Sequence, residues 1–346
     1  MTHVHLVVPD GFDDPDRPSG GNVYDRRVLA GLAARGWRAE VHRVPHALPR
    51  PEPDAVAHLR GVVAALPDAS VVLIDGLIAS CAAEVLVPAA ARLHVVVLLH
   101  MPVGTPSEGA VLNAARGVVV PSEYARRYVT ARHAVPGMRL HVARPGVDRT
   151  TPARRTSTGG RLLCVGAVAT HKRQHLLLDA LASLTDLAWR CTFVGPQDAE
   201  YAAGLRTRAQ QAGITGRVEF TGPLTGSRLA YAYTRADLLL HASEAESYGM
   251  VIIEALAHGL PVIATAVGGA PEALGRTPAG RIPGVLIPSA DPTALAAQFA
   301  AAIRAWLTNA ELRRELREAA AQRGQALAGW DETVERVGGA LAAART

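Results

Sequence analysis

The 346-residue chain is predicted to fold as two α/β domains, each built on a doubly wound parallel sheet. Its length and its 49% hydrophobic content are enough for two buried cores, at ~100–200 residues per domain. Short apolar runs alternate with helix-length segments, as in β-α-β units whose strands are buried on both faces. The alternation stops in a polar linker at 146–160 and then restarts. We therefore predict domains at 1–150 and 151–328, followed by a C-terminal helix at 329–346 that crosses back to the first domain.

The elements follow in order along the chain. Val28, Leu29 and Leu32 form an apolar stripe that predicts a helix from about Val23 to Ala34, after a loop rich in Gly, Pro and Asp. A second helical pattern covers Trp330–Ala344. The predicted strands of the first half are His3–Val8, Val71–Ile74, His94–Leu99 and Val118–Val120. Those of the second half are Arg161–Val165, Cys191–Val194, Val218–Phe220, Leu238–His241 and Pro261–Thr265. Such sheets bind ligands at the carboxyl ends of their strands, so the cleft between the domains is the expected site.

Charge and cysteine content exclude several classes of protein. The net charge of +5 is shared evenly, with 16 arginines against 14 acidic residues in 1–150, and aromatic residues are few, which argues against nucleic-acid binding. Three cysteines are too few for a disulfide framework, and Cys164 and Cys191 lie in apolar runs as expected for buried thiols. Lys172 is the only lysine among 36 basic residues. Such an excess of arginine is typical of a GC-rich bacterial genome.

No segment has the character of a targeting or membrane element. The N-terminal residues lack a basic region and a long apolar stretch. The uncharged stretch Ala255–Pro271 contains His258, Gly259 and Pro261, and therefore predicts a helix end, a turn and a strand. Arg126, Arg127 and Arg132 are interpreted as a solvated helix face rather than a membrane contact. We expect a soluble cytoplasmic protein that does not associate with membranes.

A buried carboxylate stands out in the second half. Glu254 is the only formally charged residue between Glu246 and Glu272, and apolar residues flank it on both sides. A buried carboxylate without a partner costs several kcal/mol, so Glu254 is expected to have a dedicated partner. That partner is an internal arginine, a backbone cap, or a ligand with paired hydroxyls such as a ribose.

Glu246 precedes the same predicted helix, which begins near Gly249. The two carboxylates are ~12 Å apart if both follow the helix axis. Between them, the N–H groups around Tyr248–Val251 form a helix start that attracts anions. A carboxylate, an anion-binding turn and a second carboxylate, in this order, are the pattern expected of a site that binds one ligand made of a sugar, a diphosphate and a nucleoside.

The segment from His241 to Leu274 closely resembles retaining glycosyltransferases of family four. It contains Glu-x7-Glu, SYG before the helix, GLPVIAT and GGAPE. Further matches are GGNVYDRRVLAGLAARGW, ARPGVD, VGAVATHK and FTGPL, in this order over nearly the whole chain. The resemblance implies the GT-B fold, in which two Rossmann-like domains face each other across a cleft.

The resemblance also implies roles for individual residues. His100, Lys172 and Glu246 would be catalytic: His100 beside the donor sugar, Lys172 at the diphosphate and Glu246 on the sugar hydroxyls. Glu254 would hold the ribose hydroxyls. The remaining donor-binding residues would be Gly20, Gly21, Gly166, Arg173, Ser247, Tyr248, Gly249, Met250 and Val251. Gly20 and Gly21 are expected in a loop that approaches the diphosphate closely.

One position departs from the family pattern. Ala167 stands where many relatives have an arginine five residues before the lysine, and His171, Arg173 or Arg144 is expected to compensate. His171 and His175 have the spacing of metal ligands but lack a third ligand. Asp14 and Asp16 form an Asp-x-Asp in a proline-rich loop, which is more typical of a solvated turn. We expect no metal requirement.

The predicted activity is sugar transfer, with retention, from a UDP- or GDP-sugar to a hydroxyl or amine. The acceptor is expected to be a small soluble molecule, in secondary metabolism. Three alternatives stay open: a nucleotide-sugar epimerase, a phosphorylase that uses pyridoxal phosphate on Lys172, and a non-catalytic nucleotide-sugar sensor. The sequence also leaves the oligomeric state open, a homodimer included.

Overall fold

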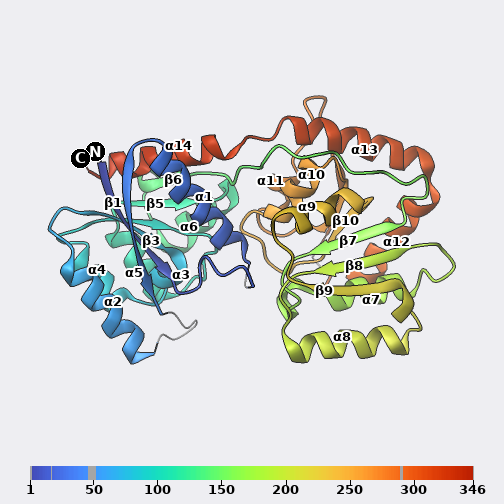
Figure 1. Cartoon of the computed structure of the whole chain (residues 1–346), viewed down its shortest axis with the longest axis horizontal. Helices are drawn as coiled ribbons and strands as arrows, with labels where there is room; N and C mark the ends of the chain where they lie inside the picture. Colours follow the sequence, from blue (N-terminus) through green and yellow to red (C-terminus); the bar gives the residue numbers. More distant parts are fainter. Residues whose placement is uncertain (1, 17, 46–51, 289–290, 346) are drawn as a thin grey trace. The chain divides into compact units, whose positions relative to one another are not determined.

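The chain divides into two compact units, each of which contains one parallel sheet (Figure 1). This computed structural model describes all residues except 1, 17, 46–51, 289, 290 and 346. Unit 1 comprises Met1–Asp14, Gly20–Gly146 and Ala328–Thr346, and unit 2 comprises Pro15–Ser19 and Val147–Leu327. The main division therefore falls four residues before the predicted boundary at 150. The prediction of two doubly wound parallel sheets is confirmed.

The sheet of unit 1 has the strand order β2-β1-β3-β4-β5-β6. Its strands are β1 (Thr2–Pro9), β2 (Trp37–Val44), β3 (Val71–Asp75), β4 (His94–Leu98), β5 (Gly117–Val120) and β6 (Leu140–Val142). The strand order reverses between β1 and β3, which is where sheets of this type leave a crevice at the carboxyl ends of the strands.

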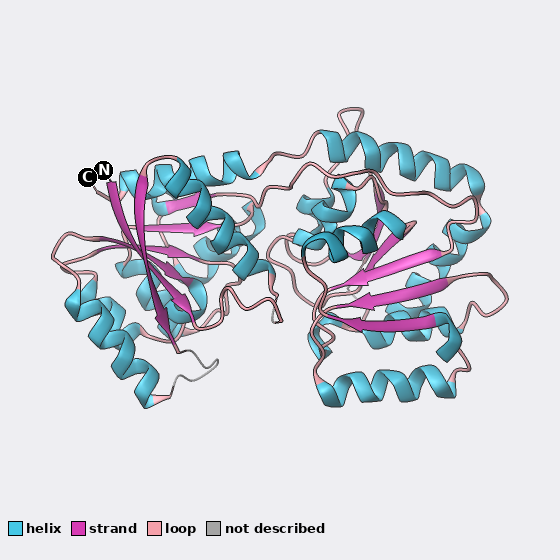
Figure 2. Cartoon of the chain, viewed as in Figure 1, coloured by secondary structure: helices cyan, strands magenta, loops and turns pink. Residues whose placement is uncertain are grey.

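Helices cover both faces of this sheet (Figure 2). They are α1 (Gly20–Ala34), α2 (Pro53–Ala65), α3 (Gly76–Ala79), α4 (Ala83–Ala89), α5 (Pro106–Ala114), α6 (Glu123–His133) and α14 (Trp330–Ala343), with a 3-10 turn at Gly137–Arg139. α1 and α14 pack on the face that contains Val4 and Leu6, and α2, α4, α5 and α6 pack on the face that contains Val7. A Cβ on Gly31 would lie 2.3 Å from a methyl carbon of Val334, so this glycine permits the close packing of α1 and α14.

The sheet of unit 2 has the order β12-β11-β10-β7-β8-β9. Its strands are β7 (Arg161–Val165), β8 (Arg190–Val194), β9 (Val218–Gly222), β10 (Leu238–His241), β11 (Val262–Thr265) and β12 (Gly284–Ile287). Counted from β7, this is the 3-2-1-4-5-6 order of dinucleotide-binding sheets, with the reversal between β7 and β10.

The helices of unit 2 form two layers as well. They are α7 (Gln174–Ala182), α8 (Ala199–Gln211), α9 (Gly226–Arg235), α10 (Met250–Ala257), α11 (Ala270–Leu274), α12 (Leu295–Thr308) and α13 (Ala310–Gln325), with 3-10 turns at Thr170–Lys172 and Thr215–Arg217. Residues of α7, α8 and α12 pack on one face of the sheet, and residues of α9, α10 and α11 pack on the other.

Three details differ from the sequence predictions. The edge strands β2 and β12 and the short β6 were not predicted. α1 begins at Gly20 instead of Val23, so Gly20 and Gly21 form the first helical turn and not a loop, which corrects their expected placement. The predicted linker is also bound along unit 2, because the Thr150 hydroxyl donates to the Ala257 carbonyl at 2.8 Å and the Ala153 N–H donates to the His258 carbonyl at 2.9 Å.

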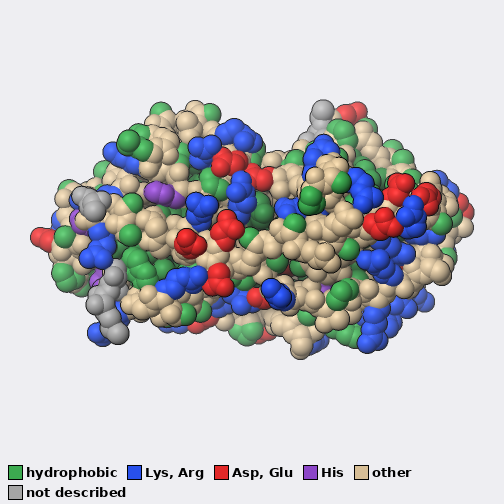
Figure 3. Space-filling model, turned by 90° about the horizontal axis from the view of Figure 1, so that it is seen from above, with side chains coloured by type: hydrophobic (Ala, Val, Ile, Leu, Met, Phe, Trp, Pro, Cys, Tyr) green, Lys and Arg blue, Asp and Glu red, His purple; other side chains and the backbone are tan. Residues whose placement is uncertain are grey.

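The surface and the thiols agree with the composition. Basic and acidic side chains are interspersed over the face in Figure 3. Cys164 and Cys191 are buried as predicted, and burial raises the pKa of the Cys164 thiol to about 12. Among the described residues, no helix combines the length and the apolar character needed to span a bilayer.

Candidate functional site

The predicted donor residues of unit 2 lie after β7 and β10, the two strands at which the strand order reverses. The loop after β7 contains the 3-10 turn Thr170–Lys172, and the loop after β10 leads to α10. The two loops are joined where the Glu244 N–H donates to the His171 carbonyl at 2.9 Å. The segments that contain Lys172 and Glu246 are thereby held together at the crevice expected of this topology.

Glu246 is the centre of this group. Lys172 Nζ lies 2.5 Å from Glu246 Oε1, and His241 Nε2 lies 3.0 Å from the same oxygen. Burial alone would raise the pKa of Glu246, but His241 and Lys172 lower it far below its usual range. Glu246 is therefore a carboxylate throughout the physiological range. The sequence predicted both Lys172 and Glu246 as site residues but did not predict that they form an ion pair.

Two glycines allow the chain after β11 to pack against the segment that contains Glu246. A Cβ on Gly268 would lie 1.9 Å from the Glu246 carbonyl oxygen, and one on Gly269 would lie 2.2 Å from the Ser247 carbonyl oxygen. The Gly269 N–H donates to the Glu246 carbonyl at 2.7 Å. Any larger residue at either position would displace this backbone. The GG of the GGAPE motif thus fixes the loop that positions Glu246, Ser247 and Tyr248.

Glu254 is half-buried instead of fully buried as predicted, and it has a partner inside unit 2. The Tyr233 hydroxyl donates to Glu254 Oε2 at 2.6 Å, so the partner is a hydroxyl and neither an arginine nor a backbone cap. Burial raises the pKa of Glu254, although the bond from Tyr233 partly opposes this. Tyr233 is itself stacked on His258, with ring centroids 5.2 Å apart. Glu254 is therefore held at one orientation on α10.

The loop after β7 contains Ala167 and the expected substitute Arg173. The Ala167 carbonyl accepts a bond from the Gln174 side chain at 2.8 Å. Arg173 has a left-handed backbone (φ 53°) and pairs with Glu244 at 2.8 Å. Arg173 thus adds a second cation to the lysine loop, whereas Arg144 belongs to unit 1.

In unit 1, three titratable side chains meet beyond the carboxyl ends of the strands. His100 follows β4, Asp75 ends β3 and Asp25 lies in α1. His100 Nε2 is 2.7 Å from Asp25 Oδ1 and 3.7 Å from Asp75 Oδ2. Burial alone would lower the pKa of His100, but the two carboxylates raise it. Burial and the charge of Asp25 raise the pKa of Asp75 to about 7.

The first turn of α1 lies against this group. A Cβ on Gly21 would lie 3.1 Å from the His100 ring, so glycine leaves room for the imidazole. The Tyr24 ring packs edge-on against His100 at 5.1 Å, and its hydroxyl donates to the Ala143 carbonyl at 2.8 Å. The structure therefore brings Gly21 and His100 together, as contacts within unit 1.

The raised pKa values of this group predict a pH-dependent stability. Asp75 binds a proton up to a pKa of about 7 in the folded state against 3.8 in the unfolded chain, and the pKa of His100 is also raised. The folded state thus holds protons that the unfolded chain has lost, so stability falls as the pH rises from 6 to 8. We expect the urea midpoint to fall over this range less steeply in Asp75→Asn than in the wild type.

The exposed Asp68 provides the matched control for this measurement. Asp68→Asn should leave the pH slope of the wild type unchanged, since Asp68 lies on the surface and pairs with Arg92. Identical slopes in the wild type and in Asp75→Asn would contradict the raised pKa of Asp75.

The sequence analysis missed Asp25, Asp75, His241 and Tyr233. Asp75 and His241 end apolar strands, and this signal was used for His100 alone. Asp25 and Tyr233 gave no such signal, since both lie within helices and not at the end of a strand. In the part of the chain that the structure describes, Asp14, Asp16, His171 and His175 belong to no cluster of three potential metal ligands, whereas Asp25, Asp75 and His100 form one.

Parts of the chain are similar in sequence to known proteins. The family described as glycosyl transferases group 1 matches residues 153–323. The chain is 36% identical over 257 residues to a D-inositol 3-phosphate glycosyltransferase of Geodermatophilus obscurus, which covers 68% of this chain and 54% of that protein. It is 33% identical over 256 residues to D-inositol 3-phosphate glycosyltransferase 1 of Catenulispora acidiphila, covering 68% and 59%. The chain thus spans little more than half the length of these relatives.

Solved structures share the fold over nearly the whole chain. Sucrose-phosphate synthase of Thermosynechococcus elongatus has a TM-score of 0.80 at 21% identity, covering 98% of both chains. Anabaena HepE, solved in complex with UDP-glucose, has a TM-score of 0.76 at 18% identity, covering 99% of this chain and 100% of that one. The predicted GT-B fold is confirmed. Residues 153–323 of the chain thus share the sequence pattern of the family of glycosyl transferases group 1.

Proposed function

We propose that this protein is a glycosyltransferase that moves a sugar from a nucleoside-diphosphate sugar to a small acceptor. The observation that carries the proposal is the group of Lys172, Glu246 and His241 at the point in unit 2 where the strand order reverses. This group precedes α10, whose first N–H groups attract anions. It also lies within the segment that matches the family.

The donor is assigned to unit 2. Lys172 and the start of α10 at Met250 would bind the diphosphate, with Gly166, Arg173, Ser247, Tyr248, Gly249 and Val251 around it. Glu254 would accept bonds from the ribose hydroxyls, since Tyr233 already holds its carboxylate in place. Lys172 and His241 lower the pKa of Glu246 and so keep it ionised. The Glu246 carboxylate would accept hydrogen bonds from the sugar hydroxyls. The donor is a UDP- or GDP-sugar, and UDP-glucose, the ligand of the similar HepE structure, is the first to test.

The transfer would proceed with retention and without a required metal. As the bond between the anomeric carbon and the diphosphate breaks, negative charge grows on the leaving phosphate, and Lys172 with the α10 N-terminus would stabilise it. The same phosphate would accept the proton of the acceptor hydroxyl, which attacks from the side on which the leaving group departs. His100, whose pKa is raised by Asp25 and Asp75, would orient the sugar.

The acceptor is proposed from the relatives. Both named relatives are D-inositol 3-phosphate glycosyltransferases, so D-inositol 3-phosphate is the first acceptor to test. The chain spans little more than half the length of those proteins. Its similarity to them therefore does not establish the acceptor, which is part of this proposal. Small polyols and sugar phosphates form the wider class.

The phosphorylase alternative fits the structure less well. Pyridoxal phosphate would need the amine of Lys172, the only lysine, yet that amine is paired with buried Glu246 at 2.5 Å. A free amine for imine formation would leave Glu246 with His241 alone. An epimerase or a sensor would not need a free lysine amine. These two alternatives are distinguished from a glycosyltransferase by experiment.

A donor screen tests the proposed function. UDP- and GDP-sugars are screened by thermal shift, in which a donor at 100 times its Kd adds about 2.7 kcal/mol of stability. The stabilising donor is then incubated with D-inositol 3-phosphate and related polyols, with and without EDTA, and products are identified by mass spectrometry. We expect a glycosylated acceptor in both conditions. An isomerised sugar formed without acceptor would indicate an epimerase, donor binding without turnover a sensor, and loss of turnover in EDTA a metal-dependent reaction.

A further inference from the structure

A second group of titratable side chains lies on unit 1, on the strands β1 and β2. His3 and His5 of β1 and Glu40 and His42 of β2 lie on the same face of the sheet, because side chains alternate along each strand and His5 is in register with Glu40. Val7, two residues after His5, belongs to the core beneath α2 and α4 on this face. The group therefore lies on the same face of the sheet as this core, toward the amino ends of the strands.

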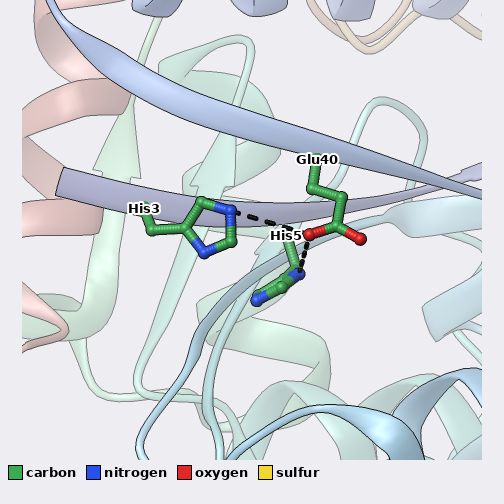
Figure 4. A group of neighbouring side chains, drawn as sticks. All are labelled: His3, His5 and Glu40. Atoms are coloured by element: carbon green, nitrogen blue, oxygen red, sulfur yellow. Dashed lines mark ion pairs between the residues drawn. The ribbon is translucent and has the colours of Figure 1, made fainter. Parts of the chain in front are cut away.

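The imidazole nitrogens converge on one carboxylate oxygen (Figure 4). His3 Nε2 lies 3.7 Å and His5 Nδ1 lies 3.6 Å from Glu40 Oε2. These three ligand atoms all lie within 4.8 Å of one another. His42 Nε2 lies 3.1 Å from His5 Nδ1 and 3.9 Å from Glu40 Oε1. His3, His5 and Glu40 thus form one group of potential metal ligands, and His42 lies beside it, hydrogen-bonded to His5.

The spacing matches what a small divalent ion requires. Zinc bonds of ~2.0–2.1 Å in a tetrahedron place the ligand atoms about 3.3 Å apart. The measured separations from Glu40 exceed this by a few tenths of an ångström, which small rotations of exposed side chains can supply. His3 and Glu40 are such side chains, at 41% and 56% exposure, whereas His5 is fixed at 8%.

The composition of the group favours a metal over a simple ion-pair cluster. One carboxylate cannot neutralise three protonated imidazoles, and the His5 side chain is buried. Neutral imidazoles with a carboxylate are the ligands that Zn²⁺ and its neighbours in the transition series prefer. Arg38, in register with His3, is exposed, so solvent screens its charge.

We propose that His3, His5 and Glu40 form a binding site for a divalent transition metal ion, Zn²⁺ by its ligand chemistry, with His42 within reach as a fourth ligand. The site is separate from the His100 group, because His5 is in register with Val72 and Asp75 lies three residues further along β3, ~10 Å away at the strand rise. A bound ion would join the edge strand β2 to β1 and stabilise unit 1.

Metal titration of the full chain, purified without a histidine tag, tests this proposal. Zn²⁺ is titrated in competition with a chromophoric chelator, and Co²⁺ is added separately to record the visible absorption of a tetrahedral site. We expect one equivalent of Zn²⁺ to bind and to raise the melting temperature. His3→Gln and Glu40→Gln should each weaken binding about tenfold or more, and both should abolish the Co²⁺ absorption.

Two variants outside the group serve as matched controls. His141→Gln in β6 and Glu335→Gln in α14 remove the same side chains elsewhere in unit 1 and should bind Zn²⁺ as the wild type does. Circular dichroism is used to check that His3→Gln and Glu40→Gln are folded, which is expected because both side chains are exposed. The absence of saturable Zn²⁺ binding, or equal affinity in the wild type and in both group variants, would overturn the proposal.

Discussion

Lys172→Ala is expected to lower kcat by about 100- to 1000-fold, the usual effect of removing one preorganised group that stabilises transition-state charge. The ammonium has two roles in the proposed site. It neutralises Glu246 in the resting protein, at 2.5 Å, and it would neutralise the diphosphate as it leaves. The second role exists only while the bond breaks, so kcat should fall far more than the donor KM rises. Steady-state kinetics with the donor from the screen measure both.

Lys172→Arg makes the same test sharper. The ammonium is a compact point charge, whereas the guanidinium is planar and directs its donors in a fixed fork. At a position that contacts a buried carboxylate, this change should still cost at least about tenfold in kcat. Arg208→Ala is the control, since Arg208 forms a surface pair with Asp179 in the same unit and its loss should change kcat by less than about twofold. If Lys172→Ala and Lys172→Arg both had the kcat and KM of the wild type, Lys172 would have no role in the reaction.

Glu254→Ala is expected to raise the donor KM about 10- to 100-fold with a smaller change in kcat. Hydrogen bonds to charged groups contribute roughly 1.5–3 kcal/mol, and the ribose hydroxyls would lose theirs in the ground state and in the transition state alike. Equilibrium titration with the nucleoside diphosphate should show the same loss of affinity, which separates binding from chemistry.

Tyr233→Phe distinguishes the contribution of the Glu254 carboxylate to donor binding from that of the hydroxyl that orients it. This variant keeps Glu254 but removes the hydroxyl that orients it at 2.6 Å. Its donor KM should rise by less than that of Glu254→Ala, and Glu254→Gln should lie between the two. An unchanged donor affinity in Glu254→Ala, in a protein with a wild-type melting curve, would contradict the ribose assignment.

The apolar runs predicted the strands in the middle of both sheets, and the missed strands lie toward the edges. Strands covered on both faces, such as β7 and β10, are apolar except for one terminal residue each and were predicted with their observed bounds. β2 lies at a sheet edge and mixes exposed residues such as Arg38 and Glu40 with half-buried Trp37 and Ala39. Its apolar pattern is therefore weak, and only its pairing with β1 makes it a strand.

The candidate site was predicted as residues and not as contacts. The apolar surroundings and the spacing indicated Glu246 and Glu254, and the family resemblance indicated Lys172. The pair of Lys172 and Glu246 spans 74 residues, and it depends on how the loops after β7 and β10 are joined. The contacts of His100 with Asp25 and Asp75 likewise depend on the placement of α1 beside β3 and β4. Periodicity and local spacing do not carry such information.

The anomeric configuration of the product tests the central claim most directly. The protein is incubated with the α-linked nucleoside-diphosphate sugar selected by the screen and with the best acceptor, and the coupling constant of the anomeric proton is measured by ¹H NMR as the product forms. Retention predicts the small coupling of an α-glycoside for a glucose-type donor, absent in Lys172→Ala over the same time. The large coupling of a β-glycoside, or consumption of the donor with no glycosidic product, would contradict the proposed retaining transfer.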